Sequence, residues 1–160
     1  MRLPGEILQG ILARAALTLL RVYLGGVFLI AAIPKLRKDF TPGLTGFVEQ
    51  KALEHSHLFY REFLQEVVLP NAQLFATLVT WGEFLVGVTL ILGLLTRLSA
   101  TVALLLTLNY MFAKGAWPWT PSSNDAAFAA ISLALAIGAA GRTLGLDAML
   151  ANRWPRSPFW

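Results

Sequence analysis

The sequence contains no cysteine, and only 14% of its 160 residues are charged. The absence of thiols excludes disulfides, thiolate-bound metals and redox chemistry on cysteine. The scarcity of charge excludes an ordinary water-soluble domain, in which about 25% of residues are charged. What the chain has instead is apolar surface, with 56% hydrophobic residues and a mean hydropathy of +0.62. This composition indicates a small membrane protein.

The basic residues do not indicate a nucleic-acid partner. The net charge is +4 at pH 7, but the cations are scattered and mostly flank apolar runs. Basic flanks of this kind are typical of membrane orientation signals and of contacts with phospholipid headgroups. We therefore expect a lipid bilayer as partner and no nucleic acid.

Four apolar stretches are each long enough to cross about 30 Å of hydrocarbon as a helix. They cover about residues 12–33, 71–95, 98–117 and 125–140. The second and third are joined by about two residues, which requires an antiparallel hairpin. We expect an all-α membrane protein with a single transmembrane domain over residues 1–160, built as an antiparallel four-helix bundle.

The long first connection, residues 34–70, is expected to lie outside the membrane. In it Phe59, Phe63 and Val67 recur every four residues, opposite charged side chains, which predicts a short amphipathic helix. Such a helix lies on the membrane surface or caps the bundle, and a helix that binds a soluble partner is the alternative.

The placement in the membrane follows from the number of spans. An even number puts both termini on one side, and the cations divide equally between the two sides, so the positive-inside rule gives a tie. We expect the cell membrane, several passes, and cytoplasmic termini. The aromatic and basic residues at 153–160, interrupted by prolines, suit an anchor at headgroup level.

Two ionisable residues inside the predicted spans are candidates for function, because such groups are costly in hydrocarbon. Arg21 lies 13 residues before Pro34, and Glu83 lies 12 residues after Asn71. Both are then about 18–20 Å below the same membrane surface. This predicts an intramembrane Arg21–Glu83 pair, with Asn109 of the third span in the same polar layer.

Two interpretations of this layer remain open. The layer either fixes the register of the helices, or it lines a cavity that binds a polar headgroup such as that of a quinone or relays a proton. In the second case Tyr23, Trp81 and Tyr110 are plausible neighbours.

The remaining polar residues suggest less specific roles. Lys35, Arg97 and Arg142 are predicted to be interfacial, with Lys35 extending its side chain to the membrane surface. His55 and His57 are the only histidines, and two ligands without a third predict no metal site. The sequence offers no phosphate loop, nucleophile elbow or haem-attachment motif, so we expect no intrinsic cofactor.

The glycines in the predicted spans are expected to allow close approach of the helices. They are Gly25, Gly26, Gly82, Gly87 and Gly93.

Several motifs in this order resemble the DoxX/DoxD membrane protein family, and especially its DoxD-like members. They are residues 21–25 (RVYLG), 34–36 (PKL), 82–87 (GEFLVG), 92–98 (LGLLTRL), 108–110 (LNY) and 141–147 (GRTLGLD). The resemblance implies a membrane subunit of the thiosulfate:quinone oxidoreductase type, although other relatives are accessory proteins. The polar positions that match are Arg21, Lys35, Glu83, Arg97, Asn109 and Arg142, and the resemblance transfers no catalytic role to any of them.

Two hypotheses for the function follow. In the first, the chain is a quinone-interacting membrane subunit of a redox complex, with Glu83 as proton donor or acceptor. In the second, it is a non-catalytic accessory subunit packed against a larger membrane complex. Because no redox cofactor motif is present, catalysis by the isolated chain is not expected under either hypothesis, and other membrane subunits are expected partners.

Overall fold

A computed structural model describes residues 4–138 and 140–154 of the chain. All secondary structure in these residues is helical. Residues 155–160, which make up most of the predicted aromatic anchor, lie outside the described part.

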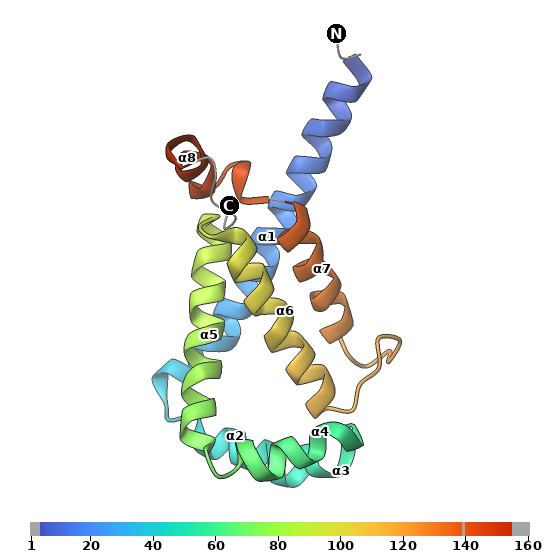
Figure 1. Cartoon of the computed structure of the whole chain (residues 1–160), viewed down its shortest axis with the longest axis vertical. Helices are drawn as coiled ribbons and strands as arrows, with labels where there is room; N and C mark the ends of the chain where they lie inside the picture. The colour runs from blue at the N-terminus through green and yellow to red at the C-terminus, as the bar shows by residue number, and fades with distance from the viewer. Residues whose placement is uncertain (1–3, 139, 155–160) are drawn as a thin grey trace.

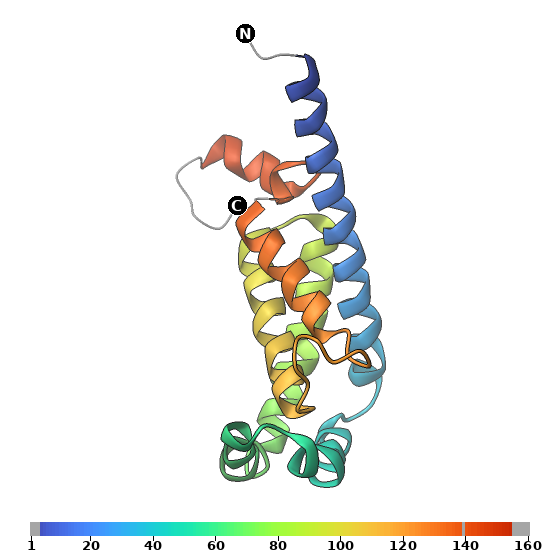
Figure 2. The same cartoon turned by 90° about the vertical axis from the view of Figure 1, so that its right-hand side faces the viewer.

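Four long helices run along the length of the molecule (Figures 1 and 2). They are α1 (Pro4–Arg37), α5 (Ala72–Leu92), α6 (Thr96–Ala113) and α7 (Asp125–Gly138). Helix α1 packs mainly against α5, α6 packs against both α5 and α7, and the N-terminal end of α1 projects beyond the other helices. Within the described residues, two segments are long and apolar enough to cross a membrane, Leu8–Arg37 and Ala72–Leu92.

Helix α1 is longer than the sequence predicted. It begins at Pro4, where the missing N–H costs nothing, and Glu6 in its first turn suits the positive end of the helix dipole. It also continues through Pro34 to Arg37, although Pro34 has no N–H to donate to the preceding turn. The helix thus extends at both ends beyond the span predicted at about residues 12–33, and Lys35 is helical.

Close contact between α1 and α5 is possible because glycines lie at their crossing. A Cβ added to Gly87 would lie 2.8 Å from the backbone nitrogen of Leu29, and one added to Gly25 would lie 3.0 Å from the Gly87 carbonyl oxygen. Gly26, by contrast, faces open space. The prediction of close approach is thus confirmed for Gly25 and Gly87 and wrong for Gly26.

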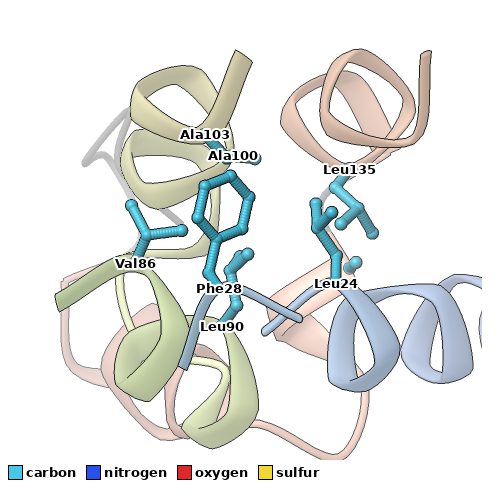
Figure 3. Packing of buried hydrophobic residues seen from close by; sticks show 8 residues of the cluster. Leu24, Phe28, Val86, Leu90, Ala100, Ala103 and Leu135 are labelled. Atoms are coloured by element: carbon cyan, nitrogen blue, oxygen red, sulfur yellow. The ribbon is translucent and has the colours of Figure 1, made fainter. Parts of the chain in front are cut away.

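The core between the four helices consists of aliphatic side chains around one aromatic ring (Figure 3). Phe28 of α1 lies beside Val86 of α5 and beneath Ala100 and Ala103 of α6. The two alanines leave room for the ring, so α6 can pack closely against the α1–α5 pair.

The connection between α1 and α5 forms a second layer across one end of the long helices (Figure 1). It contains α2 (Thr41–Phe47), α3 (Leu53–His55) and α4 (Leu58–Phe63), with π-helical turns at Val48–Ala52 and Leu64–Val68. The sequence predicted one short helix in this connection, whereas nearly all of it is helical.

The buried face of this layer is not the predicted apolar stripe, which a helix lying on a membrane surface would turn to the lipid. Phe59 and Val67, two members of the predicted apolar stripe, are exposed. Leu64 and Val68 are buried instead, and Tyr60 packs against them. The inward stripe thus lies one residue later along the sequence.

Candidate functional site

A cavity of about 300 Å³ lies between α5, α6 and the layer formed by α2 and α4. Most of its wall is aromatic or aliphatic, including Phe40, Phe47, Phe63 and Phe75. Its polar and charged side chains are Lys35, Tyr60, Glu83, Asn109, Tyr110 and Lys114. An apolar cavity with a few polar groups is the usual form of a site for a small organic molecule.

Glu83 is the most deeply buried charged group of this cavity, with 2% of its surface exposed. Its Oε2 lies 2.5 Å from Lys35 Nζ, and its Oε1 accepts a hydrogen bond of 2.7 Å from the Tyr110 hydroxyl. Both carboxylate oxygens therefore have a donor. A buried charge is tolerated when it is paired and hydrogen-bonded in this way.

Lys35 is a partner of Glu83, a contact that the sequence analysis did not predict, and its interfacial role stays a prediction. Because α1 continues past Pro34, the side chain of Lys35 reaches α5 and is only 19% exposed. Its Nζ also lies 5.0 Å from the centre of the Phe40 ring, within reach of a cation–π interaction.

Tyr60 and Asn109 form a second polar pair on the cavity wall. The Tyr60 hydroxyl donates a hydrogen bond to Asn109 Oδ1, and Asn109 Nδ2 donates to the Leu105 carbonyl at 2.6 Å. Burial raises the pKa of Tyr60 to about 12, so its hydroxyl stays neutral at physiological pH. Tyr60 was not among the site residues expected from the sequence. Its spacing of four residues from Leu64 could have indicated it, because residues four apart lie on the same face of a helix.

The two π-helical turns also contribute to the cavity, through Val48, Leu64 and Val68. A π-helical turn inserts one residue and so rotates the side chains that follow, and such turns are frequent at functional sites.

Lys114 brings a second cation to the cavity from the end of α6. Its Nζ lies 2.9 Å from Asp125 Oδ2, at the start of α7, and 6.0 Å from the centre of the Tyr110 ring. The cavity is therefore flanked by one buried carboxylate and two cations.

The predicted Arg21–Glu83 pair does not form. Arg21 is buried, but its Nη1 and Nη2 donate to the carbonyl oxygens of Ala140 and Leu144 at 3.3 and 3.0 Å. Its guanidinium adjoins Gly93, ten residues beyond Glu83 on α5, which is a rise of about 15 Å. The prediction assumed that α5 begins at the level at which α1 leaves the membrane, whereas α5 begins beside α2.

Arg21 belongs instead to a second buried polar cluster at the opposite end of the helices. There Asp147 of α8 (Leu146–Arg153) accepts hydrogen bonds from the backbone N–H groups of Leu95 and Thr96, at 2.7 and 2.8 Å. Asp147 also interacts electrostatically with Arg21. The cluster satisfies amides at the start of α6 and ties α8 to this end of α6, which is a structural role.

The other predicted site residues are divided between these regions. Asn109 and Tyr110 line the cavity, whereas Tyr23 is 56% exposed and contacts Phe128. Trp81 is also exposed and lies outside the cavity. Of the residues that the sequence assigned to this layer or its neighbourhood, Glu83, Asn109 and Tyr110 line the cavity. Arg21, Tyr23 and Trp81 do not.

Arg97 and Arg142 lie at the Arg21 end of the molecule, at the beginning of α6 and in the turn before α8. Their interfacial role stays a prediction. The His57 ring packs against Phe59, Phe112 and Trp117. Among the described residues, no group of three or more His, Cys, Asp or Glu side chains could hold a metal ion.

Comparison with known proteins places these features in a family. The family model DoxD, described as "TQO small subunit DoxD", matches residues 16–157. The chain belongs to the DoxD family. No curated protein and no solved structure matches it. The DoxD match contains both the Lys35–Glu83–Tyr110 group and the Arg21–Asp147 cluster.

Proposed function

We propose that the chain is the membrane subunit of a thiosulfate:quinone oxidoreductase and that its aromatic cavity binds the quinone headgroup. The observation that carries this proposal is the hydrogen-bonded group Lys35–Glu83–Tyr110 in the wall of a largely apolar cavity. Membership of the DoxD family, whose description names a subunit of TQO, supports the same function.

The lining of the cavity fits a quinone. A quinone headgroup is a flat apolar ring with two carbonyl oxygens, which require hydrogen-bond donors. Phe40, Phe63 and Phe75 offer aromatic surface for the ring. Lys35 has three N–H donors and gives one to Glu83, so it retains donors for a carbonyl oxygen. The second N–H of Asn109 Nδ2 is a further donor.

The residues around Glu83 are arranged to hold and transfer a proton. A bound quinone would accept two electrons and two protons on reduction. The Glu83 carboxylate can hold a proton, and the hydrogen bond from Tyr110 fixes its orientation. Lys35 donates to the other carboxylate oxygen, so both oxygens of Glu83 are held in place. The electrons come from a thiosulfate-oxidising partner subunit, because the chain is proposed to carry no redox cofactor and to be inactive alone.

The surface of the described structure supports placement in a membrane. Large apolar side chains are exposed on all four long helices, among them Leu19, Leu78, Leu105 and Ile137. Such a surface suits lipid rather than water. We therefore propose four membrane spans formed by α1, α5, α6 and α7 in the antiparallel arrangement, in the cell membrane with cytoplasmic termini. A cysteine introduced at exposed Lys51, accessible only from outside intact cells, would support this orientation.

Binding of a short-chain ubiquinone analogue to the purified protein tests the quinone site. We expect the analogue to raise the Tm of the wild type and to have little effect on Glu83→Gln or Lys35→Met. Tyr23→Phe is the matched control, because Tyr23 lies outside the cavity, and it should respond as the wild type does. An unchanged Tm for the wild type, or an equal rise in Glu83→Gln, would contradict the proposal.

The alternative of a non-catalytic accessory subunit predicts a different result in the same experiment. In that case the analogue has no effect on any variant, and Glu83→Gln changes only the amount of chain that co-purifies with the larger membrane complex.

A further inference from the structure

A second hollow of about 270 Å³ is lined in part by Lys35, the partner of Glu83. It lies between the end of α1, the turn into α2 and the first half of α5. Its lining is largely polar, in contrast to the aromatic cavity, and includes Lys38, Asp39, Thr41, Gln73, Thr77 and Thr80. We call it the polar hollow.

The polar hollow extends toward Glu83 along one face of α5. Gln73, Thr77 and Thr80 are spaced by four and three residues, and Glu83 follows after three more, so all four lie on neighbouring positions of one helical face. Gln73 and Thr77 are exposed, whereas Thr80 is only 7% exposed. The hollow therefore leads from the surface to the turn of α5 next to Glu83, over about 10 Å.

The polar hollow and the aromatic cavity share two lining residues, Lys35 and Phe40. Lys35 Nζ lies against the Phe40 ring and donates to Glu83 Oε2. The other oxygen, Oε1, accepts from Tyr110, which lines only the aromatic cavity. One oxygen of the Glu83 carboxylate is therefore bonded to Lys35, which lines both hollows. The other oxygen is bonded to Tyr110 of the aromatic cavity.

We propose that the polar hollow is the aqueous route by which protons reach Glu83, with Lys35 and Phe40 as the partition that keeps this water out of the quinone site. The hollow is polar and has room for several water molecules, since each occupies about 30 Å³ in the liquid. The inference rests on the proposed quinone site. It accounts for the two protons consumed with each pair of electrons, which the aromatic walls of the cavity cannot supply.

The natural absence of cysteine makes a direct test possible, because a single cysteine can be introduced without any background thiol. The probe is a small, charged, membrane-impermeant methanethiosulfonate, which reacts with the thiolate and therefore requires water at the site. The test variant is Thr80→Cys, which is buried and reached through the hollow. The matched control is Leu78→Cys on the same helix, which is 56% exposed but lies outside the hollow.

We expect Thr80→Cys, in proteoliposomes, to react at least ~10-fold faster than Leu78→Cys, because a lipid-facing thiol ionises poorly. Thr77→Cys, at the exposed mouth of the hollow, should react at least as fast as Thr80→Cys and shows that the reagent reaches this side of the vesicles. Equal rates for Thr80→Cys and Leu78→Cys, with Thr77→Cys reactive, would overturn the proposal.

A second measurement separates the route from the quinone site. With Thr80→Cys modified, we expect the ubiquinone analogue still to raise the Tm, while thiosulfate-dependent quinone reduction in membranes falls several-fold. Unchanged reduction would overturn the proton route alone. Rapid modification together with no effect of the analogue on the unmodified protein would overturn the quinone site, although the hollow would still be shown to contain water.

Discussion

Lys35 Nζ and Glu83 Oε2 lie 2.5 Å apart although the two residues are 48 positions apart in the chain. The pair joins the last turns of α1 to the middle of α5 at the point where the polar hollow and the aromatic cavity meet. Removing two charges from water is costly, and their mutual contact, the hydrogen bond from Tyr110 and the contact of Lys35 with the Phe40 ring offset that cost. The stability of the fold and the chemistry of the site therefore depend on the same contact.

Neutralising one member of this pair should destabilise the protein more than neutralising both. Lys35→Met leaves the Glu83 carboxylate buried without a cation, which costs on the order of 3–5 kcal/mol. The double variant Lys35→Met with Glu83→Gln should recover most of this loss, because no charge remains buried. Denaturant unfolding in detergent measures both, and Lys38→Met, which removes an exposed cation, is the control. Additive effects in the double variant would contradict the coupling.

The crossing of α1 and α5 yields a prediction about packing. Gly87→Ala places a Cβ 2.8 Å from the Leu29 backbone nitrogen, and backbone cannot move aside as a flexible side chain can. We expect a loss of about 1–3 kcal/mol in the free energy of unfolding. Gly26→Ala on α1 has open space and gains helix propensity, so it should be neutral or slightly stabilising. Equal thermal stability of the two variants would show that the helices cross elsewhere.

The glycines at the crossing of α1 and α5 explain which part of the structure the sequence could predict. Hydropathy located the long helices because the apolar runs are long. It does not fix how far one helix is shifted along its neighbour, because a uniformly apolar helix buries a similar apolar area at any shift. The Arg21–Glu83 prediction set the register by assuming that α5 begins at the level at which α1 leaves the membrane. The register of the structure is fixed by the close contact between Gly25 of α1 and Gly87 of α5. In that register Lys35, not Arg21, reaches Glu83.

The cavity was predicted in part for a comparable reason. Glu83, Asn109 and Tyr110 attracted attention because polar groups in apolar helices are costly. Tyr60 lies in the connection, where the sequence analysis took the neighbouring stripe of Phe59, Phe63 and Val67 as the apolar face of the predicted helix. The buried stripe of Tyr60, Leu64 and Val68 has the same four-residue spacing one position later, so spacing alone does not decide between the two stripes.

The Arg21–Asp147 cluster should be required for folding rather than for quinone binding. Asp147→Ala removes the acceptor for the Leu95 and Thr96 amides and leaves buried Arg21 without its carboxylate. We expect a lower Tm and faster proteolysis within α8. Glu49→Ala, which removes an exposed carboxylate, should do neither. Because the cluster is far from the cavity, any Asp147→Ala protein that folds should bind the ubiquinone analogue with wild-type affinity, and a selective loss of binding would contradict the structural role.

The raised pKa of Tyr60 predicts how stability depends on alkaline pH. A tyrosine in the unfolded chain ionises near its ordinary value of 10, whereas burial keeps Tyr60 protonated in the folded protein up to about 12. The stability that this shift contributes is therefore complete below pH 10 and is lost as the pH rises from 10 to 12. Tyr60→Phe cannot ionise, so its free energy of unfolding should fall less steeply over this interval than that of the wild type. Tyr23→Phe removes an exposed hydroxyl and should retain the wild-type slope, and parallel curves for wild type and Tyr60→Phe would show that Tyr60 is not buried against the cavity.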